Sequence, residues 1–551
     1  MFAAISNRFR NFSKNRLLDV ASLLLIATVI AGLAWQSDFL KVMYEDYAYH
    51  LLVAQNYSHA GGITTWDHWE SAPVGRPQNY PPVWQFSMSW LIGLPLDPSA
   101  MHTFFSLLAI GLGLSLAWLG IRLWHGSLTA FFFLILAASF GRYITLLGVI
   151  TPSSLVLASF PLLAFLLKEK RWIGAGALLT IMLYTHMIIP WLVIGTLGAW
   201  YLWKRDWRDW RQFFGTIAAA IALYLPWGLL VFQNRRYILY TDPNYLATPR
   251  IPDLYLSLSL LALSGLALAI FSIARLRNRP NLPSIAPWVI LMVAQVPILY
   301  SNHPSRFGIS GGAFMMMIIS AVGLRYLWQQ PKFRLAVAAV LVFCALYSVE
   351  LSTIGQNGQQ IISSAPSLLR QIASYENSDL AFYLQPMNVF TPENIRLAEV
   401  IRNNTEKNDV IYNANDYFNL EIYPRFKHYM PAQFFGSIAG RPIANARNPE
   451  YYWQAELPLE KAKIVIADLR QTHIFTGEKK KEDSELADKL ASDFELIAQE
   501  DRTLVFKNKS DEVFKMPDPD SAINRWAAMG LLVLALSLIS RELLVIHRTR
   551  S

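Results

Sequence analysis

Two adjacent carboxylates, Glu45 and Asp46, lie in the stretch YEDYAYH, residues 44–50, directly after an apolar run long enough to cross a bilayer. A carboxylate at the edge of a membrane is costly unless it is hydrated, paired or bound to a metal. One interpretation is a general base or metal ligand that activates a hydroxyl or amide at the membrane surface. The other is a solvated loop carboxylate near Lys41.

A metal at this position would be a hard cation such as Mg²⁺ or Mn²⁺, which needs several oxygen ligands. Asp46 is the candidate ligand, and Glu45 and Asp67 are the carboxylates that could add to it. Neighbouring residues on a helix point in different directions. We therefore expect one of Glu45 and Asp46 to act and the other to be a bystander.

The elements that must position these residues are membrane helices. Of the 551 residues, 54% are hydrophobic and only 16% are charged, and runs of about 20 apolar residues are typical of membrane spans. The sequence predicts about twelve spans, near residues 17–36, 102–122, 127–147, 149–167, 172–186, 187–203, 213–232, 256–274, 285–301, 308–326, 334–353 and 526–546.

Short basic loops predict the orientation of these spans. If the N-terminus is cytoplasmic, alternation places every dense basic cluster on the same side, as the positive-inside rule requires. The clusters lie at 8–16, 168–171, 204–211, 275–279, 332–334 and in the tail HRTRS. We therefore expect a multi-pass protein of the inner or plasma membrane of the cell, with both termini in the cytoplasm. The net charge of +9 reflects topology, and no basic stripe points to nucleic acid.

The opposite side receives three polar segments, 37–101, 233–255 and 354–521. The first suggests two helices on the membrane surface, joined by a Gly/Pro-rich turn, with Trp84 and Trp90 at headgroup level. The third mixes strand-like pieces (DVIYNA, AKIVIADL, TLVFKN) with the helix-like EDSELADKLASDFELIAQE. It is typical of a mixed α/β domain.

The predicted domain boundaries follow from these segments. Residues 1–353 would form a multi-span domain that includes the first external loop, 37–101. Residues 354–521 would form the extracytoplasmic α/β domain, and 522–551 the last span with its tail. The single cysteine, Cys344, excludes an internal disulfide.

The order of small motifs in the first loop resembles a known family. Asp46 to His50 reads DYAYH, and TTWDHWESAPVGRPQNYPPVW follows. This resembles the first external loop of oligosaccharyltransferase catalytic subunits, which are GT-C integral-membrane glycosyltransferases. The resemblance implies a GT-C-like fold and a sugar donor carried on a polyprenyl or dolichyl phosphate. It also implies that Asp46 is the essential carboxylate, with His50 and Asp67 in the substrate loop.

Two later stretches extend the resemblance. GRYITLLGVITPSS, 141–154, is similar to the family's second external loop, and Arg142 matches its arginine. The family's acidic metal-binding pair is replaced there by residues 151–153, Thr-Pro-Ser. SNHPSRFGISGG, 301–312, resembles the Arg-Phe whose arginine contacts lipid phosphate. Arg306 also suits phosphate physically, because a guanidinium binds it bidentately, although an interfacial snorkelling arginine is the alternative.

The remaining candidates match less of the family pattern. YNANDYFNL, 412–420, keeps Asp416 and Tyr417 of the acceptor-recognition motif, without its tryptophans or glycine. The loop 233–255 carries Arg235 and Tyr245, and in this superfamily the corresponding loop can order over donor or acceptor. An ordinary basic and aromatic interfacial loop is the alternative.

The sequence thus predicts a membrane glycosyltransferase. It would transfer a sugar or oligosaccharide from a polyprenyl-phosphate or -diphosphate carrier to a protein, lipid or glycan acceptor on the extracytoplasmic face. Arg306, Arg142 and Arg235 would hold the donor phosphate. Two alternatives stay open. One is a transporter or flippase of lipid-linked saccharides, which would place charges at mid-bilayer. The other is an O-antigen-type polymerase or ligase, which would rely on outer-loop arginines.

Overall fold

The structure is a computed structural model, and it describes the following residues: 2–35, 45–69, 72–94, 96–148, 152–204, 207–235, 258–259, 285–295, 312–353, 360–366, 369–370, 392–413, 431–444, 457–468, 490–500 and 503–550.

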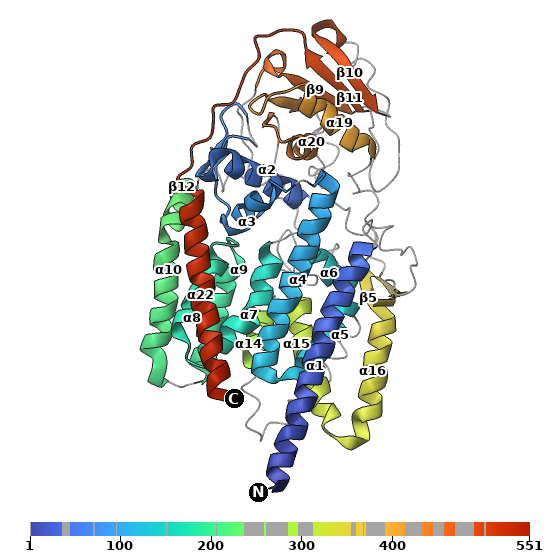
Figure 1. The fold of residues 1–551 in the computed structure, drawn as a ribbon, viewed down its shortest axis with the longest axis vertical. Helices are drawn as coiled ribbons and strands as arrows, with labels where there is room; N and C mark the ends of the chain where they lie inside the picture. Colours follow the sequence, from blue (N-terminus) through green and yellow to red (C-terminus); the bar gives the residue numbers. More distant parts are fainter. Residues whose placement is uncertain are drawn as a thin grey trace.

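Apolar helices form a bundle that contains both chain termini at its lower end (Figure 1). The bundle consists of α1 (Phe2–Trp35), α4 (Pro98–His125), α5 (Ser127–Ser139), α6 (Gly141–Gly148), α7 (Pro152–Lys168), α8 (Trp172–Leu183), α9 (Ile189–Lys204), α10 (Trp210–Gln233), α14 (Ala286–Ala294), α15 (Gly312–Trp328), α16 (Arg334–Leu346) and α22 (Arg525–Arg550), with short 3₁₀ turns at Trp207–Asp209 and Pro331–Phe333. Gly120 lets α4 approach α7 closely, because a Cβ there would collide with the backbone of Pro161 and Leu162.

The predicted number of spans is not confirmed. Within the described ranges, four helices are long and apolar enough to cross a membrane by themselves. A fifth candidate is the pair formed by α15 and Pro331–Leu346, which is bent by 118°. Helices α5, α7, α8 and α9 are apolar but shorter, and the run 256–274 lies outside the described residues apart from Leu258–Ser259.

Two predicted spans end earlier than expected. The run 127–147 is broken at Phe140, which leaves helical geometry at φ −92° and ψ 87°, and Gly141 then begins α6. The run 334–353 stops at Leu346, and Tyr347–Thr353 forms strand β5. Alternation of polar and apolar residues in YSVELST favours a strand over a helix. Strand β5 pairs with β4 (Leu258–Ser259) and β6 (Gln360–Pro366).

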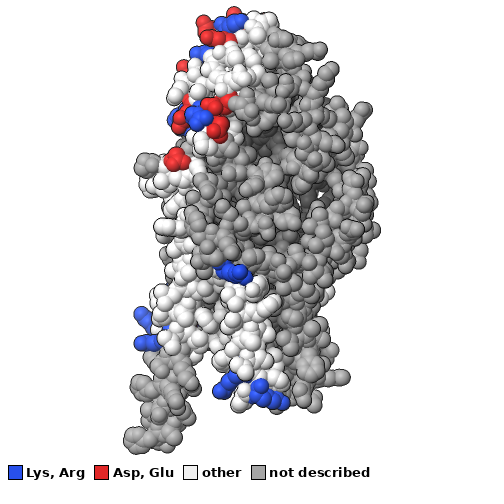
Figure 2. All heavy atoms as spheres, turned by 90° about the vertical axis from the view of Figure 1, so that its right-hand side faces the viewer, with Lys and Arg blue, Asp and Glu red and all other residues white. Residues whose placement is uncertain are grey.

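Ion pairs join several basic clusters at the lower end of the bundle. Arg122 at the end of α4 binds Asp19 of α1, at 2.6 Å between Nη2 and Oδ2. Lys170 pairs with Asp209, and Arg171 pairs with Glu542 of α22. Among the described residues on the face seen in Figure 2, the charged side chains visible at this end are all lysines and arginines. At the opposite end, acidic and basic side chains are mixed.

The segment between α1 and α4 lies above the bundle (Figure 1). It contains α2 (Glu45–Ala60), α3 (Val83–Leu91) and, between them, β1 (Gly62–Ile63), β2 (Trp66–Asp67) and β3 (Arg76–Pro77). The two helices predicted for this loop are therefore present. Trp84 is not at a headgroup surface as predicted, because it is 6% exposed in a core that α3 shares with α2 and the domain above.

A domain with a mixed sheet forms the top of the molecule, and we call it the sheet domain. Its strands have the order β10-β11-β9-β7-β8, in which β7 is parallel to β8 and β9 and the other pairs are antiparallel. Its elements are α19 (Pro392–Asn403), β7 (Ile411–Asn413), α20 (Pro431–Ala439), β8 (Ile443–Ala444), a 3₁₀ turn (Leu459–Lys461), β9 (Ile464–Asp468), β10 (Phe494–Glu500) and β11 (Thr503–Asn508). The predicted helix in EDSELADKLASDFELIAQE is wrong from Phe494 onward, where the chain pairs with β11 instead.

Alternation along the strands gives the sheet two apolar faces. Ile464 and Ile466 of β9 join a core with α19, α20 and α2, whereas Val465 and Ala467 join a second core with β10 and β11. The α2–α3 segment is therefore part of the sheet domain's packing. Strand β12 (Ile523–Asn524) pairs with β1 and joins the segment to α22 as well.

Candidate active site on the segment between α1 and α4

Helix α2 presents two different faces, because residues three and four apart lie on the same side of a helix. Position 46 shares one face with Tyr49, His50 and Tyr57. Those three residues contact polar groups of the following loop. The face of α2 that carries residue 46 is therefore lined by a polar network, which we call the α2 network.

His50 is a neutral member of this network. It is 2% exposed, and Nε2 of Gln85 on α3 donates to its Nδ1 at 3.0 Å. Burial, with a smaller contribution from nearby His186, lowers the pKa of His50 to about 3. At neutral pH the imidazole is therefore uncharged, accepts at Nδ1 and carries its proton on Nε2.

Gln78 bridges two tyrosines of α2. Its Nε2 donates to the hydroxyl of Tyr57 and its Oε1 accepts from the hydroxyl of Tyr49, both at 3.3 Å. Its backbone N–H also donates to the carbonyl of Thr65 at 2.9 Å. Gln78 is fully buried, so this amide holds the loop against α2 through both its side chain and its backbone. Burial raises the pKa of Tyr57, so its hydroxyl stays protonated.

The turn between β2 and β3 places two buried charged residues opposite each other. Asp67 and Arg76 are register partners, at 0% and 5% exposure. Oδ1 of Asp67 accepts from the backbone N–H of Trp69 at 2.9 Å, and the guanidinium of Arg76 lies 5.1 Å above the ring of Tyr49. Gly75, at φ +72°, permits this turn, because a Cβ there would collide with the backbone of Asp67.

Tyr80 connects the network to the bundle. Its ring lies 5.1 Å from that of His50 and 5.8 Å from that of His186, measured between centroids. Nδ1 of His186 accepts from the backbone N–H groups of Ile188 and Ile189, so it caps the start of α9. The carbonyl of Tyr184 accepts from the first N–H of α3 at 2.9 Å. The end of α8 therefore fixes the position of both α3 and the network.

Helix α6 lies beside the helices that flank the predicted site. The ring of Tyr143 stacks on Phe314 of α15 at 5.6 Å, and Leu147 packs where Gly113 of α4 has no side chain. At its upper end α4 also contacts α2, because the ring of His102 lies 4.2 Å from that of Tyr47. Position 142 is thus connected to the start of α2 through one helix.

The predicted site residues are described by the structure to different extents. Glu45 and Asp46 begin α2 and Arg142 lies on α6, but their side chains are outside the described residues. His50 and Asp67 lie within or beside the α2 network. Arg235 is exposed after α10, where Nη1 donates to the carbonyl of Phe232 at 3.0 Å. Four further candidates lie wholly outside the described residues, namely Tyr245, Arg306, Asp416 and Tyr417.

No group of three or more His, Cys, Asp or Glu side chains that could hold a metal ion occurs in the described part of the chain. The binding of Mg²⁺ or Mn²⁺ through Asp46 stays a prediction of the sequence.

The motif comparison missed Gln78 and Gln85, the two amides that organise the α2 network. The sequence holds only a weak signal for Gln85, as a polar residue between Trp84 and Phe86 in an otherwise apolar helix.

Comparison with known proteins shows similarity in structure alone. No protein-family model matches the sequence, and neither does any curated protein. The solved structure of ArnT from Cupriavidus metallidurans in the apo state has a TM-score of 0.52 at 14% identity, over 89% of this chain and 99% of that one. The structure of the same protein bound to undecaprenyl phosphate gives 0.51 at 14% identity, over 90% and 99%.

The archaeal oligosaccharyltransferase AglB from Archaeoglobus fulgidus, in complex with an inhibitory peptide and a dolichol-phosphate, has a TM-score of 0.44 at 13% identity. That match covers 81% of this chain and 69% of AglB. ArnT and AglB are both GT-C glycosyltransferases. The likeness to ArnT extends over most of both chains, and this protein therefore has the fold of the GT-C membrane glycosyltransferases.

Proposed function

We propose that this protein is a membrane glycosyltransferase that transfers a sugar or oligosaccharide from a polyprenyl-phosphate or polyprenyl-diphosphate carrier to an acceptor on the extracytoplasmic face. The observation that carries the proposal is the likeness to ArnT over nearly the whole of both chains. One of the ArnT structures contains undecaprenyl phosphate, a polyprenyl phosphate. The motif resemblance at Asp46 supports the same activity independently of the fold.

The proposed reaction is a substitution at the anomeric carbon of the donor sugar. The acceptor nucleophile forms a bond to that carbon, while the bond from the carbon to the lipid phosphate oxygen breaks. The carboxylate of Asp46 takes the proton of the acceptor, and the lipid phosphate leaves as an anion. Proton transfer of this kind contributes roughly 10² to 10⁴ in rate.

The fixed position of α2 supports this role for Asp46. The α2 network is buried and hydrogen-bonded, and His50 stays neutral at physiological pH. The hydrogen bonds from Gln78 and Gln85 leave α2 little freedom to shift. Such fixed positioning is what a general base requires.

Arg306, with Arg142 and Arg235, is the proposed contact to the donor phosphate. A guanidinium binds phosphate with two parallel hydrogen bonds, whereas an ammonium is a point charge. We expect Arg306→Lys to weaken the use of donor more than the use of acceptor, measured as separate KM values. An unchanged KM for donor would remove Arg306 from the site.

The decisive experiment compares wild type with Asp46→Asn and Glu45→Gln in the host membrane. Each variant is first shown to insert and accumulate normally. The envelope proteins and glycolipids are then analysed by intact mass. We expect one glycoform to be lost with Asp46→Asn and kept with Glu45→Gln, which would also identify the acceptor. If only a pool of lipid-linked sugar changes, the protein is a transporter and the proposal fails.

A further inference from the structure

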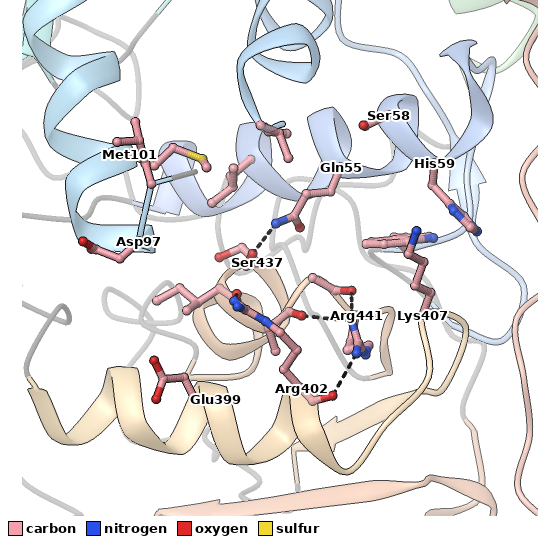
Figure 3. A pocket seen from close by; sticks show the side chains of 17 residues that line it. Gln55, Ser58, His59, Asp97, Met101, Glu399, Arg402, Lys407, Ser437 and Arg441 are labelled. Atoms are coloured by element: carbon pink, nitrogen blue, oxygen red, sulfur yellow. Dashed lines mark hydrogen bonds between the residues drawn. The ribbon is translucent and has the colours of Figure 1, made fainter. Parts of the chain in front are cut away.

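A cavity of about 400 Å³ lies on the face of α2 that is turned away from the α2 network (Figure 3). Its walls come from α2, the start of α4, α19 and α20, so it lies where the α2–α3 segment meets the sheet domain. Small-molecule sites in proteins have volumes of roughly 300 to 1,000 Å³. Nothing in the proposed transfer reaction uses this cavity.

Two side chains of the cavity wall carry buried polar atoms that have no hydrogen-bond partner among the residues that the structure describes. These atoms are Nε1 of Trp69, a donor on a residue that is 3% exposed, and Oε1 of Gln55, an acceptor. The amide nitrogen of Gln55 donates to the carbonyl of Ser437 at 2.6 Å, which fixes the orientation of the amide. Buried polar groups without partners are rare in proteins and call for a specific explanation. A bound hydroxyl group would explain both atoms, because it donates and accepts.

Cationic side chains predominate in the same wall. The wall contains three cationic residues, Arg402, Lys407 and Arg441, and two acidic ones, Glu399 and Asp97. Its net charge is therefore +1. Asp97 is occupied as the cap of α4, accepting from the backbone N–H of Ala100. Lys407 has no ion pair within the part of the chain that the structure describes. Figure 3 shows Lys407 and Arg402 on the side of the cavity that faces Gln55.

Arg441 has a different role in the cavity wall. Its guanidinium donates to the hydroxyl of Thr405 at 2.7 Å and to the carbonyls of Arg402, Thr405, Ala439 and Gly440. These bonds join α19 to the end of α20 and leave Arg441 with little capacity for a ligand. Arg402 uses one of its nitrogens on the carbonyl of Ile438 at 2.6 Å. The groups that remain available to bind an anionic ligand are therefore the ammonium of Lys407 and the other guanidinium N–H groups of Arg402.

We propose that this cavity binds an acidic saccharide. Sugar hydroxyls satisfy Nε1 of Trp69 and Oε1 of Gln55, and a carboxylate on the sugar pairs with Lys407 and Arg402. The rings of Trp69 and His59, 5.8 Å apart, offer apolar surface to a sugar face. The site is distinct from Asp46, because residues 46 and 55 are separated by about 13 Å of helix rise and lie on opposite sides of α2.

The role that this site would have rests on the proposed function. A glycan acceptor extends over several sugar units, so a unit remote from the reacting end can be held behind α2. In that position the cavity selects acidic acceptors without touching the reacting atoms. Binding itself does not depend on transfer, and the two can be measured separately.

Titration calorimetry on the full chain in lipid nanodiscs tests the inference. The probes are a trisaccharide of galacturonate, a neutral galactose trisaccharide of the same linkage, and inorganic phosphate. Lys407 is exposed, and water screens such ion pairs, so we expect Lys407→Gln to weaken binding of the acidic trisaccharide about two- to fivefold. Lys515→Gln is the matched control, because Lys515 is paired with Glu406 and does not line the cavity.

Each outcome decides one question. Binding of the acidic trisaccharide that is tighter than that of the neutral one, and is reduced by Lys407→Gln but not by Lys515→Gln, supports the site. Absence of binding, equal affinity for both trisaccharides, or no effect of Lys407→Gln overturns it. Phosphate that binds as tightly as the acidic trisaccharide overturns the saccharide assignment. Asp46→Asn must bind normally, so loss of transfer with retained binding separates the two proposals.

Discussion

The two faces of α2 differ in how they hold the helix. On one face, Tyr49, His50 and Tyr57 contact a buried network of neutral amides and rings. On the other face, Tyr47, Leu51 and Ala54 pack into the core of the sheet domain, and Gln55 borders the charged cavity. The first face is therefore held mainly by directional hydrogen bonds. The second is held mainly by apolar burial, with one hydrogen bond from Gln55 to the carbonyl of Ser437.

Backbone pairing makes the second face inseparable from the sheet domain. The carbonyl of Trp69 accepts from the N–H of Ile443 at 2.7 Å, and the N–H of Ala72 donates to the carbonyl of Ile443 at 2.9 Å. The α2–α3 segment thus extends the sheet beyond β8. The position of residue 46 therefore depends on the helix bundle through one face of α2 and on the sheet domain through the other.

The largest expected effect is on the sheet-domain face, at Arg441. Arg441→Leu removes hydrogen bonds from four residues and leaves several buried carbonyls without a partner. We expect the sheet domain to lose on the order of 3–5 kcal/mol in stability. Thermal unfolding in nanodiscs, with limited proteolysis as a second probe, measures this. The control is Arg396→Leu on α19, whose exposed pair with Glu500 should contribute little to stability.

The next effect is on the network face, at Gln78. Gln78→Leu keeps the volume but removes the hydrogen bonds to both Tyr49 and Tyr57. Because a buried hydroxyl without a partner costs about 1–3 kcal/mol, we expect a loss of about 2 kcal/mol in stability and reduced transfer activity. Gln55→Leu, on the opposite face, should leave transfer to a simple neutral acceptor unchanged. If both variants are as active as wild type, the α2 network does not position residue 46.

Much of the architecture could be predicted because apolar runs and strand-like pieces are local signals. The pieces around Ile411, Ile464 and Thr503 all form strands of the sheet domain. The stretch from Phe494 was predicted as a helix, because Ala, Leu, Glu and Lys around it favour one. Pairing with β11 overrides that local preference, and a single sequence does not reveal it.

The candidate site was predictable only in its location. The carboxylates and His50 were found through spacing within the first loop, but the partner of His50 lies 35 residues away on α3. Gln78 reaches Tyr49 and Tyr57 across a turn whose course depends on Gly75. Contacts of this kind arise from tertiary folding, so composition and periodicity carry no trace of them. Likewise the cavity requires α19 and α20, which lie more than 300 residues away in the sequence.

A smaller effect is expected from pH on the network face. The pKa of His50 is about 3 in the folded protein and about 6.5 when unfolded, so the unfolded state binds more protons between these values. Stability should therefore fall as pH decreases from 6.5 toward 3, by about 1.4 kcal/mol per pH unit from this group. His50→Gln removes the contribution. Comparing unfolding of both proteins at pH 7.5 and pH 5 should show a steeper loss for wild type, by about 2 kcal/mol. An equal loss of stability in wild type and in His50→Gln would mean that His50 is in contact with water and keeps its ordinary pKa.

The smallest effect is expected at the edge of the cavity, where His59 and Asp518 approach to 3.2 Å between Nε2 and Oδ1. Asp518 is largely exposed and also accepts from Nδ2 of Asn408 at 2.7 Å, and these two hydrogen bonds, that of Asn408 first, hold the pKa of its carboxyl below the usual value. Exposed pairs contribute little because water and salt screen them. His59→Gln should therefore leave the unfolding midpoint unchanged at high salt and lower it barely at low salt. A loss close to that of Arg441→Leu would mean that the exposed edge of the cavity contributes as much to stability as its hydrogen-bonded wall. Asp518→Asn separates these cases, since it keeps the geometry of the pair and removes only the charge.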